Sequence, residues 1–516
     1  MHRVIGPLAA APSLALFTLL FVGCGSSPFG SVTTTPNPLV AEYSVNPALR
    51  GTVTVEFGET TDYGRSTSAV ATTVGPVNVL VAGMKANTTY HMRAHADYDN
   101  GTSQEDVDHS FTTGSLPQGL LPSYTVTATS GLSPQAGVEL VDTIAKATPS
   151  TAFATDVDGN VIWAYLFPDR QAAAQLLPIK LLPNGHFMCL IAPNSSDVVS
   201  APAPPNTLNE MREIDLAGNI IRTFTMTDLN AELALAHFNI TLQAFSHDFA
   251  MLPNGHFLVL ANTVRPFTNL PGYPGVTQVV GDVVVDLDAN LNPVWLWNEF
   301  DHLDVNRHPM LFPDWTHSNA LIYSPDDGNF LVSIRHQNWV VKVDYRNGGG
   351  TGNILWKLGE GGDFKLEGAT DPTDWFYAQH DLNFASSNTT GSFRLAMLDN
   401  GDDREFPPGV TCNGAGAPPC LYSTIPVMQI DENAKTASFV FHQILPPNFY
   451  NAFAGSTRVL DNTNIEYNLA AINASDAYTF EVTPTDTPQT VWEMHIAGTL
   501  TYRSFRMPSL YPGVQW

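Results

Sequence analysis

The stretch VVVDLDANLNPVWLWNEF, residues 283–300, decides the fold. A run of β-branched residues ends at Asp286, a turn rich in Asp and Asn follows, and a second apolar run carries two tryptophans. Two such runs separated by turn residues predict a β-hairpin.

The same plan of strand, acidic residue, turn and strand occurs in six places. They are residues 152–167, 211–226, 283–300, 340–359, 427–444 and 477–496, with Asp156, Asp215, Asp286, Asp344, Asp431 and Glu481 at the ends of their first strands. A second strand pair lies between consecutive copies, as at 179–192, 248–262 and 320–335. Two hairpins make a four-stranded unit, so residues 120–516 are predicted to form an all-β, six-bladed β-propeller.

The N-terminal part follows a different plan. Residues 36–115 contain alternating strands broken by Gly, Asn and Asp turns, which predicts a small β-sandwich of fibronectin or immunoglobulin type. The run GMKANTTYHMRAHA, residues 83–96, resembles the tyrosine corner of fibronectin type III modules. GSLPQGLLPS, residues 114–123, is the predicted linker.

The charge of the chain excludes one class of partner. With 49 acidic and 23 basic residues in 516, the net charge is -26. Nucleic-acid binding requires Lys and Arg to replace condensed counterions, so we expect no nucleic-acid partner. An anionic substrate would need a local positive field from His, Arg or backbone N–H groups.

The N-terminus is typical of an export signal. Residues 1–23 have a basic start and an apolar run, and Cys24 follows a small residue. The pattern predicts a lipoprotein-type signal with acylation at Cys24; cleavage and release is the alternative. The protein is therefore expected to be exported, as a periplasmic or cell-envelope lipoprotein, with membrane contact only through this lipid.

The other cysteines are assigned from their surroundings. CNGAGAPPC closes a short Gly/Pro-rich loop in a chain predicted to be exported, so a disulfide between Cys412 and Cys420 is expected. Cys189, within GHFMCLI, is predicted to be an ordinary buried strand residue.

Three histidines occupy matching places in the repeats. His247, His317 and His380 each lie at the start of a predicted innermost strand, so they should converge on the propeller axis. A hydrogen-bonded core histidine is the alternative for any one of them, but burying three imidazoles without a purpose is costly.

Other polar residues near these positions are assigned by local pattern. His186 and His256 lie in PNGHF turns, where a turn role suffices. His336 follows Arg335 and is expected on the opposite face of its strand, whereas alternation alone leaves open whether Arg335 faces the axis.

Histidines gathered with an arginine suit two chemistries. Three imidazoles are enough ligands for a metal. An imidazole nitrogen can also act as a nucleophile while cations hold the transferred anion. The arginine favours the second, because a fixed cation repels a metal dication.

Several motifs together resemble the bacterial arylsulfate sulfotransferase (ASST) family. They are SHDF (246–249), THSNALIY (316–323), LVSIRHQNWVVKVD (331–344), GNILWKLG (352–359), QHDLNF (379–384), MLDNGDD (397–403), AGSTRVL (454–460) and YRSFRMPSLY (502–511). The resemblance covers nearly all of the chain after residue 120 and includes the preceding small sandwich.

The resemblance implies a role for each candidate residue. His380 would be the nucleophile that becomes a sulfohistidine, and His247, His317 and Arg335 would bind the sulfuryl oxygens. Asn319 and Ser456, or its neighbour Thr457, would assist in substrate binding. The reaction would move a sulfuryl group from a phenolic sulfate ester to a phenol by a ping-pong mechanism, without 3′-phosphoadenosine 5′-phosphosulfate and without a cofactor.

Other functions stay open at this point. A non-catalytic propeller that binds carbohydrate or protein would use the histidines in recognition. A metal-dependent propeller hydrolase and a quinone-dependent dehydrogenase are further alternatives. The expected partners are small phenolic sulfate donors and phenol acceptors, and a homodimer is compatible with the sequence.

Overall fold

The computed structural model describes residues 29–73, 75–144, 149–193, 198–200, 203–402, 404 and 421–516. Nearly all regular structure in this part of the chain is β-strand. The single α-helix described, α1 (Met226–Leu235), begins at a capping box, in which Thr225 Oγ1 accepts from Asp228 N and Asp228 Oδ2 accepts from Thr225 N. The helix is absent from the sequence-based prediction.

Two sheets in the N-terminal region share one hydrophobic core. Their orders are β1-β2-β6 and β4-β3-β7-β8, with β5 paired to β3 and β9 to β7. The strands are β1 (Gly30–Thr34), β2 (Ala41–Val45), β3 (Gly51–Gly58), β4 (Arg65–Ser66), β5 (Val70–Thr72), β6 (Val77–Val81), β7 (Thr89–Tyr98), β8 (Ser103–Glu105) and β9 (His109–Thr112). Tyr43 and Val81 of the first sheet pack with Phe57 and Met92 of the second. As the tyrosine-corner pattern predicts, the Tyr90 hydroxyl accepts a hydrogen bond from Lys85 N at 3.0 Å.

The remaining strands form six sheets of four or five strands each. Their orders are β35-β11-β12-β13, β14-β15-β16-β17, β18-β19-β20-β21, β22-β23-β24-β25, β27-β28-β29-β30-β26 and β31-β32-β33-β34-β10. The predicted hairpin at residues 283–300 is confirmed, because β20 pairs with β21 across the turn.

The strands of the first three of these sheets are bounded as follows: β11 (Val138–Thr143), β12 (Ala152–Asp156), β13 (Val161–Ala164), β14 (Ala174–Leu181), β15 (Phe187–Pro193), β16 (Glu210–Ile214), β17 (Ile220–Thr225), β18 (Ala244–Met251), β19 (Phe257–Leu270), β20 (Tyr273–Leu287), β21 (Pro293–Asn298) and β35 (Thr501–Met507). Those of the other three are β10 (Ser123–Ala128), β22 (Ser318–Ser324), β23 (Asn329–Ile334), β24 (Trp339–Val343), β25 (Ile354–Gly359), β26 (Lys365–Glu367), β27 (His380–Phe384), β28 (Ser392–Leu398), β29 (Thr424–Asp431), β30 (Thr436–Ile444), β31 (Ser456–Val459), β32 (Ile465–Ile472), β33 (Asp476–Val482) and β34 (Thr490–Ala497). Short 3₁₀ turns lie at Glu299–Asp301 (η1), Arg335–Gln337 (η2), Arg346–Gly348 (η3) and Pro447–Phe449 (η4).

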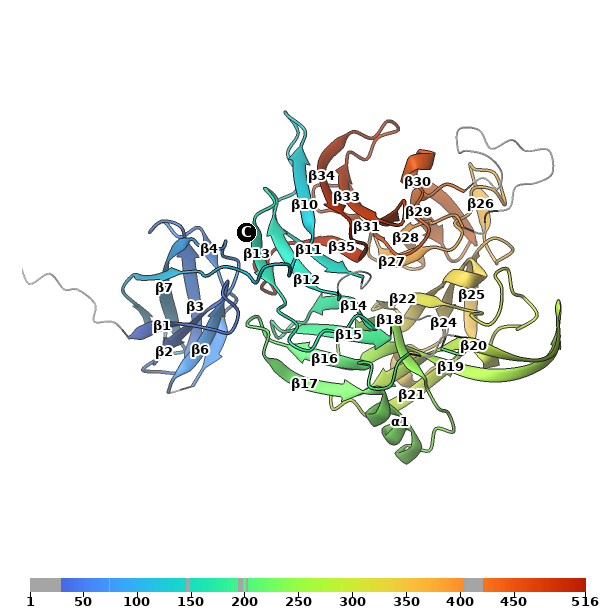
Figure 1. Ribbon diagram of the computed structural model, residues 1–516, viewed down its shortest axis with the longest axis horizontal. Helices are drawn as coiled ribbons and strands as arrows, with labels where there is room; N and C mark the ends of the chain where they lie inside the picture. The colour runs from blue at the N-terminus through green and yellow to red at the C-terminus, as the bar shows by residue number, and fades with distance from the viewer. Residues whose placement is uncertain are drawn as a thin grey trace, which may run out of the picture.

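Each of the six sheets contacts the next through its innermost strand. In order, β14 contacts β18, β18 contacts β22, β22 contacts β27, β27 contacts β31, and β31 contacts β35. β14 also contacts β35 and β11, which belong to one sheet. Figure 1 shows these sheets arranged around a common centre, with the N-terminal strands to one side. The sheet that contains β35 joins the two ends of this region, because β35 from the C-terminal end pairs with β11. We call β14, β18, β22, β27, β31 and β35 the inner strands.

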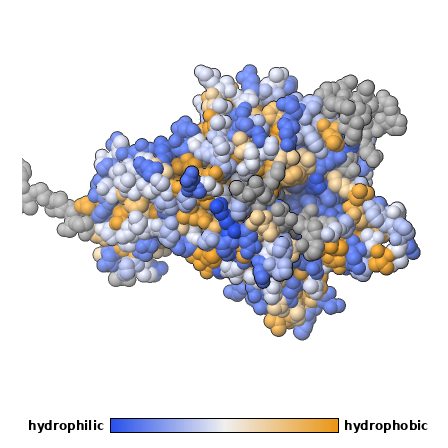
Figure 2. Space-filling view, in the orientation of Figure 1, coloured by the Kyte–Doolittle hydropathy of each residue, from blue (hydrophilic) through white to orange (hydrophobic). Residues whose placement is uncertain are grey.

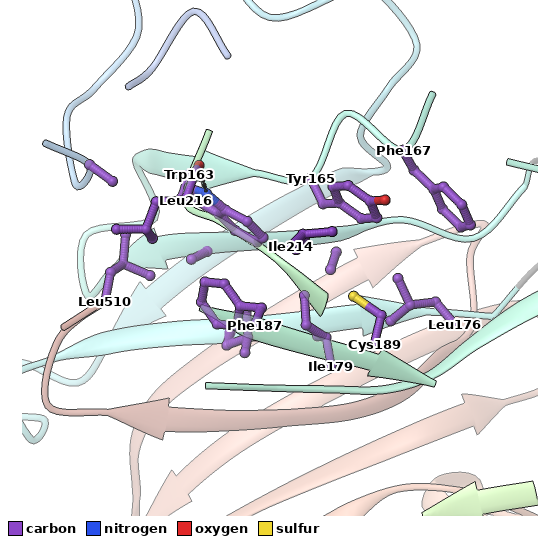
Figure 3. Packing of buried hydrophobic residues seen from close by; sticks show 14 of the residues in the cluster. Trp163, Tyr165, Phe167, Leu176, Ile179, Phe187, Cys189, Ile214, Leu216 and Leu510 are labelled. Atoms are coloured by element: carbon purple, nitrogen blue, oxygen red, sulfur yellow. Dashed lines mark hydrogen bonds between the residues drawn. The ribbon is translucent and has the colours of Figure 1, made fainter. Parts of the chain in front are cut away.

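Large side chains between neighbouring sheets form the core. Figure 3 shows one such cluster, in which the Trp163 and Phe187 rings stack with centroids 4.8 Å apart. The indole of Trp163 donates to Leu216 O at 2.8 Å, so its one polar group is satisfied inside an apolar cluster. Packing of this kind holds adjacent sheets in a fixed relation.

The C-terminal tail packs against the N-terminal sheets. The Trp516 ring lies edge-on to Phe57, and the Tyr511 hydroxyl donates to Leu80 O and accepts from Ala82 N. Figure 2 shows hydrophobic residues in small separate groups among hydrophilic ones on the face viewed. Within the described residues, no helix is long and apolar enough to cross a bilayer.

Candidate active site

The three predicted histidines lie on three successive inner strands. His247 is within β18, His317 directly precedes β22, and His380 begins β27. The pairing register shifts beside each of them, between Phe245 and Phe249, Ser318 and Ala320, and His380 and Asn383. Such irregularities turn a side chain away from the regular alternation of a strand.

The backbone at these shifts is strained. His247 and His317 have positive φ angles of 43° and 50°, and Asp381, next to His380, has a φ of 56°. Residues other than glycine take this left-handed region at a cost, and such residues gather at functional sites.

The imidazole rings form one cluster. The His247 and His317 ring centroids are 4.5 Å apart, and those of His317 and His336 are 4.6 Å apart. His380 lies close to Arg335, because Ala454 N donates to His380 Nε2 and Arg335 Nη2 donates to Ala452 O, two residues earlier. The convergence predicted from the repeats is therefore seen in the structure.

The prediction for His336 is wrong. Strand β23 ends at Ile334, and Arg335–Gln337 form the 3₁₀ turn η2, so strand alternation no longer applies. The turn brings His336 onto the His317 ring, and the His336 Nε2 accepts a hydrogen bond from Arg335 Nη1. His336 is thus a fourth histidine of the cluster.

The hydrogen bonds of His380 assign its tautomer. Asn400 Nδ2 donates to Asn451 O and Ala454 O, so Asn400 Oδ1 is an acceptor, 2.7 Å from His380 Nδ1. His380 Nδ1 therefore carries the proton. His380 Nε2 is the lone-pair nitrogen, and it accepts a hydrogen bond of 3.2 Å from Ala454 N.

All four imidazoles are held neutral. Burial is the main cause that lowers the pKa values of His247, His317 and His380 well below 6.5, and neighbouring positive charge adds to the effect. Burial, together with the charges of His317 and Arg335, lowers the pKa of His336 to about 3. A neutral imidazole has the free electron pair that a nucleophile needs.

Arg335 lies at the edge of the imidazole cluster. Its Nη2 pairs with the Asp402 carboxylate and donates to Ala452 O, and its Nη1 contacts His336. Its Nε is buried with no hydrogen-bond partner within the described part of the chain. The guanidinium thus adds a fixed positive charge and a spare donor to the site.

Asp314 joins two of the histidines. His317 Nδ1 donates to Asp314 Oδ2 at 2.6 Å, and His336 Nδ1 donates to Asp314 O at 2.7 Å. The bond from His317 places its proton on Nδ1 and leaves Nε2 as a base.

The same three residues test the metal alternative. Asp314, His317 and His336 form the one group in the described ranges whose ligand atoms could hold a metal ion, all within 4.8 Å of one another. Both nitrogens of His336 already have partners, and one of these is the Arg335 cation. The group therefore fits a hydrogen-bonded relay better than a metal centre.

The two predicted substrate-binding residues, Asn319 and Ser456, form hydrogen bonds within the protein. Asn319 Nδ2 donates to Gln379 O at 2.7 Å, while Asn319 Oδ1 is buried with no partner among the described residues. The Ser456 hydroxyl donates to Ser504 O at 2.6 Å, which ties β31 to β35. The neighbouring Thr457 Oγ1 is buried and has no partner in the described part of the chain.

Of the four cysteines, the structure describes Cys189. Cys189 is free and fully buried in β15, as expected. Cys24, Cys412 and Cys420 lie outside the described residues, so the lipid and the disulfide stay predictions.

Sequence reasoning missed Asn400, Asp402 and Asp314. Asn400 and Asp402 are in the noted motif MLDNGDD, and Asp314 lies two residues before the motif THSNALIY. Their spacing carried no recognisable ligand or catalytic pattern, because each acts through a histidine or arginine elsewhere in the chain.

Comparison with known families assigns the chain to one of them. The Arylsulfotransferase (ASST) family matches residues 124–503, which is most of the chain. The protein belongs to this family, and family membership supports aryl sulfotransferase activity on phenolic substrates in general.

Other comparisons add little. A search of curated proteins gives no match. Similar solved structures include a putative 6-phosphogluconolactonase from Bacteroides fragilis (10% identity, 89% of this chain and 98% of that chain, TM-score 0.36) and the periplasmic gluconolactonase PpgL of Pseudomonas aeruginosa (10%, 71% and 98%, TM-score 0.38). An auxiliary nutrient binding protein from Bacteroides thetaiotaomicron is also similar (8%, 91% and 98%, TM-score 0.30). At these TM-scores the similarity supports no conclusion about fold or activity.

Proposed function

We propose that the protein transfers a sulfuryl group from a phenolic sulfate ester to a phenol through a sulfohistidine at His380. The observation that carries the proposal is the neutral His380, whose unprotonated Nε2 lies in a cluster with three more histidines and Arg335. Nucleophile, fixed cation and neutral bases are the groups that this reaction needs.

In the first half-reaction, His380 Nε2 gives up its hydrogen bond from Ala454 N and attacks the sulfur of the donor. The N–S bond forms as the S–O bond to the aryl group breaks, and the electron pair leaves with the phenolate oxygen. Arg335 stabilises the sulfuryl oxygens after exchanging its bond to Asp402 for one to the donor. Positive charge builds on the imidazole ring, and Asn400 Oδ1 stabilises it through the Nδ1 proton.

In the second half-reaction, the oxygen of the acceptor phenol attacks the same sulfur. The N–S bond breaks and its electron pair returns to His380 Nε2. His317 Nε2 takes the proton of the phenol, and Asp314 stabilises the resulting imidazolium through Nδ1. That proton then passes to solvent, which supplies one to the first phenolate.

The architecture that we propose follows from the sheet contacts. The six sheets would form a closed six-bladed propeller over residues 120–516, and residues 36–115 a β-sandwich. Cyclic contact between the inner strands and the pairing of β35 with β11 support closure. An export signal over residues 1–23, lipidation at Cys24 and a Cys412–Cys420 disulfide belong to the same proposal.

One assay tests the function. Purified metal-free protein is incubated with 4-nitrophenyl sulfate, with and without phenol. We expect phenol-dependent release of nitrophenol that survives a chelator and disappears in His380→Asn. The matched control is His256→Asn, a turn histidine that should keep full activity.

Two results would overturn the proposal. Absence of turnover in the wild type would favour a binding module. Turnover that requires added metal, or that persists in His380→Asn, would favour the metal-dependent hydrolase.

A further inference from the structure

A buried ion network includes the residues that follow two of the site histidines. Two of the site histidines are followed by aspartates, Asp248 on β18 and Asp381 on β27, and both aspartates are almost fully buried. Arg503, on β35, is 1% exposed and reaches both: Nη1 is 3.4 Å from Asp248 Oδ1, and Nε is 3.3 Å from Asp381 Oδ1.

Arg503 also contacts the strand of the third histidine. Its Nη2 donates to Asn319 O at 2.8 Å, two residues beyond His317. One guanidinium therefore touches the residue next to His247, the residue next to His380, and the backbone near His317. The preceding Tyr502 adds a fourth contact, because its hydroxyl donates to His247 O at 2.8 Å.

Each aspartate of the network accepts a hydrogen bond from a backbone N–H of the neighbouring sheet. Asp248 Oδ2 accepts from Leu321 N of β22 at 3.0 Å, and Asp381 Oδ2 accepts from Thr457 N of β31 at 3.1 Å. A third aspartate, Asp142 on β11, accepts from Arg503 N at 2.6 Å and from Ile179 N of β14 at 3.4 Å.

The network contains three cations and, with Asp142, three aspartates. Lys180 pairs with Asp248, Arg458 pairs with Asp381, and Arg503 lies between them. A buried ion network stabilises a fold weakly compared with packed hydrophobic residues, and its best attested use is to select one register. Here the selected register includes the left-handed backbone at His247, His317 and Asp381.

We propose that Arg503 is a positioning residue for sulfuryl transfer, which sets His247, His317 and His380 relative to one another through Asp248, Asn319 and Asp381. The inference rests on the proposed function of the cluster. Its physical basis is that one planar guanidinium, ion-paired with aspartates on two inner strands and hydrogen-bonded to the backbone of a third, constrains their relative placement, which a point charge cannot do.

The same strand offers a matched control. Arg506, three residues on, is equally buried and bonds to Glu139 and Glu481 and packs on Trp492. Within the described part of the chain, its contacts include no residue of the histidine cluster. Replacing either arginine by lysine removes a buried fork from β35, but only Arg503→Lys should disturb the histidines.

The experiment compares the kcat and KM values of wild type, Arg503→Lys and Arg506→Lys. The melting temperature of each protein is measured first, so that kcat is calculated per folded molecule. We expect kcat to fall on the order of 100-fold in Arg503→Lys with the KM for 4-nitrophenyl sulfate changed less than about threefold, because a small misplacement of reacting groups costs about this much. Arg506→Lys should keep kcat within about threefold of wild type.

A second measurement does not depend on activity. In ¹⁵N NMR spectra of the imidazoles, Arg503→Lys should change the chemical shifts of the site histidines. Arg506→Lys should leave these chemical shifts unchanged. If the wild type is inactive, the proposed function fails and the spectra still decide the inference. Equal kcat values for the two variants in an active enzyme, or unchanged site resonances in Arg503→Lys, overturn the inference.

A second variant covers the case in which Arg503→Lys does not fold. Asp381→Asn keeps the acceptor for Thr457 N but weakens the pair with Arg503. We expect a fall in kcat of about tenfold for Asp381→Asn, because His380 is the neighbouring residue and a small misplacement of a reacting group lowers kcat. Full activity in Asp381→Asn overturns the inference.

Discussion

The histidines of the inner strands and the histidines of the outer turns differ in burial. His256 is 26% exposed in its side chain and bonds to Asp286 at 3.0 Å, and His186 is 32% exposed and bonds to Glu213 at 2.7 Å. His380 is 2% exposed and has an amide and a backbone N–H as partners. An exposed histidine beside a carboxylate is an ordinary surface pair, whereas a buried one held neutral near an arginine is suited to chemistry.

The largest test of this contrast replaces the cation of the site. Arg335→Leu should lower kcat/KM by about 1000-fold, because the donor that stabilises the transferred anion is lost. Circular dichroism should show the fold intact. Arg346→Leu is the control, since Arg346 is an exposed residue paired with Asp344 in the same sheet. Equal activity of the two variants would remove Arg335 from the site.

The next test exchanges one histidine from each group. His317→Asn should lower kcat/KM by about 100-fold, because a base in contact with the reaction is removed. His256→Asn should change it by less than about twofold, as expected for a surface substitution. A loss in both variants would mean that the inner and outer histidines do not differ in function.

A smaller effect is expected from the carboxylate that orients His317. Asp314→Asn should lower kcat/KM about tenfold, since a hydrogen bond to a charged acceptor contributes about 1.5 kcal/mol or more. Asp476→Asn is the control, because Asp476 forms an exposed pair with His495 at 2.9 Å. Full activity of Asp314→Asn would contradict the relay role of Asp314.

The smallest effect is a pH dependence. The pKa of His380 is lowered by burial, so the imidazole stays neutral as the pH falls through 6.5, where an exposed histidine would gain its proton. Activity depends on the neutral form and should therefore be lost only below this range. We expect kcat/KM at about pH 5.5 to stay within about threefold of its neutral value. A tenfold loss with an apparent pKa near 6.5 would show that the nucleophile is an ordinary exposed histidine.

Much of the fold could be predicted because its signal is periodic. The β20–β21 hairpin lies where the repeat of acidic residue and turn places it. Helix α1 escaped prediction because it is a short insertion in a β pattern, begun by the local capping box of Thr225 and Asp228. The site histidines were found for the same reason as the hairpins, since they recur at matching places on successive inner strands.

The rest of the site depends on contacts between distant segments. His336 was misplaced because alternation assumes a continuing strand, whereas η2 turns the chain at Arg335. Asn400 bonds to His380 from 20 residues further along the chain, and Arg503 of the last inner strand bonds to Asn319 O, near His317. No local pattern marks such contacts.

By itself, the sequence determined the all-β repeat, the family and the three histidines, because these depend on residue order and local spacing. The tertiary structure was needed to show which nitrogen of His380 is unprotonated, that Arg335 is paired with Asp402, and that Arg503 contacts three inner strands. Tautomer, pKa and strand placement depend on burial and on partners far apart in the chain, and these exist only after the sheets have packed.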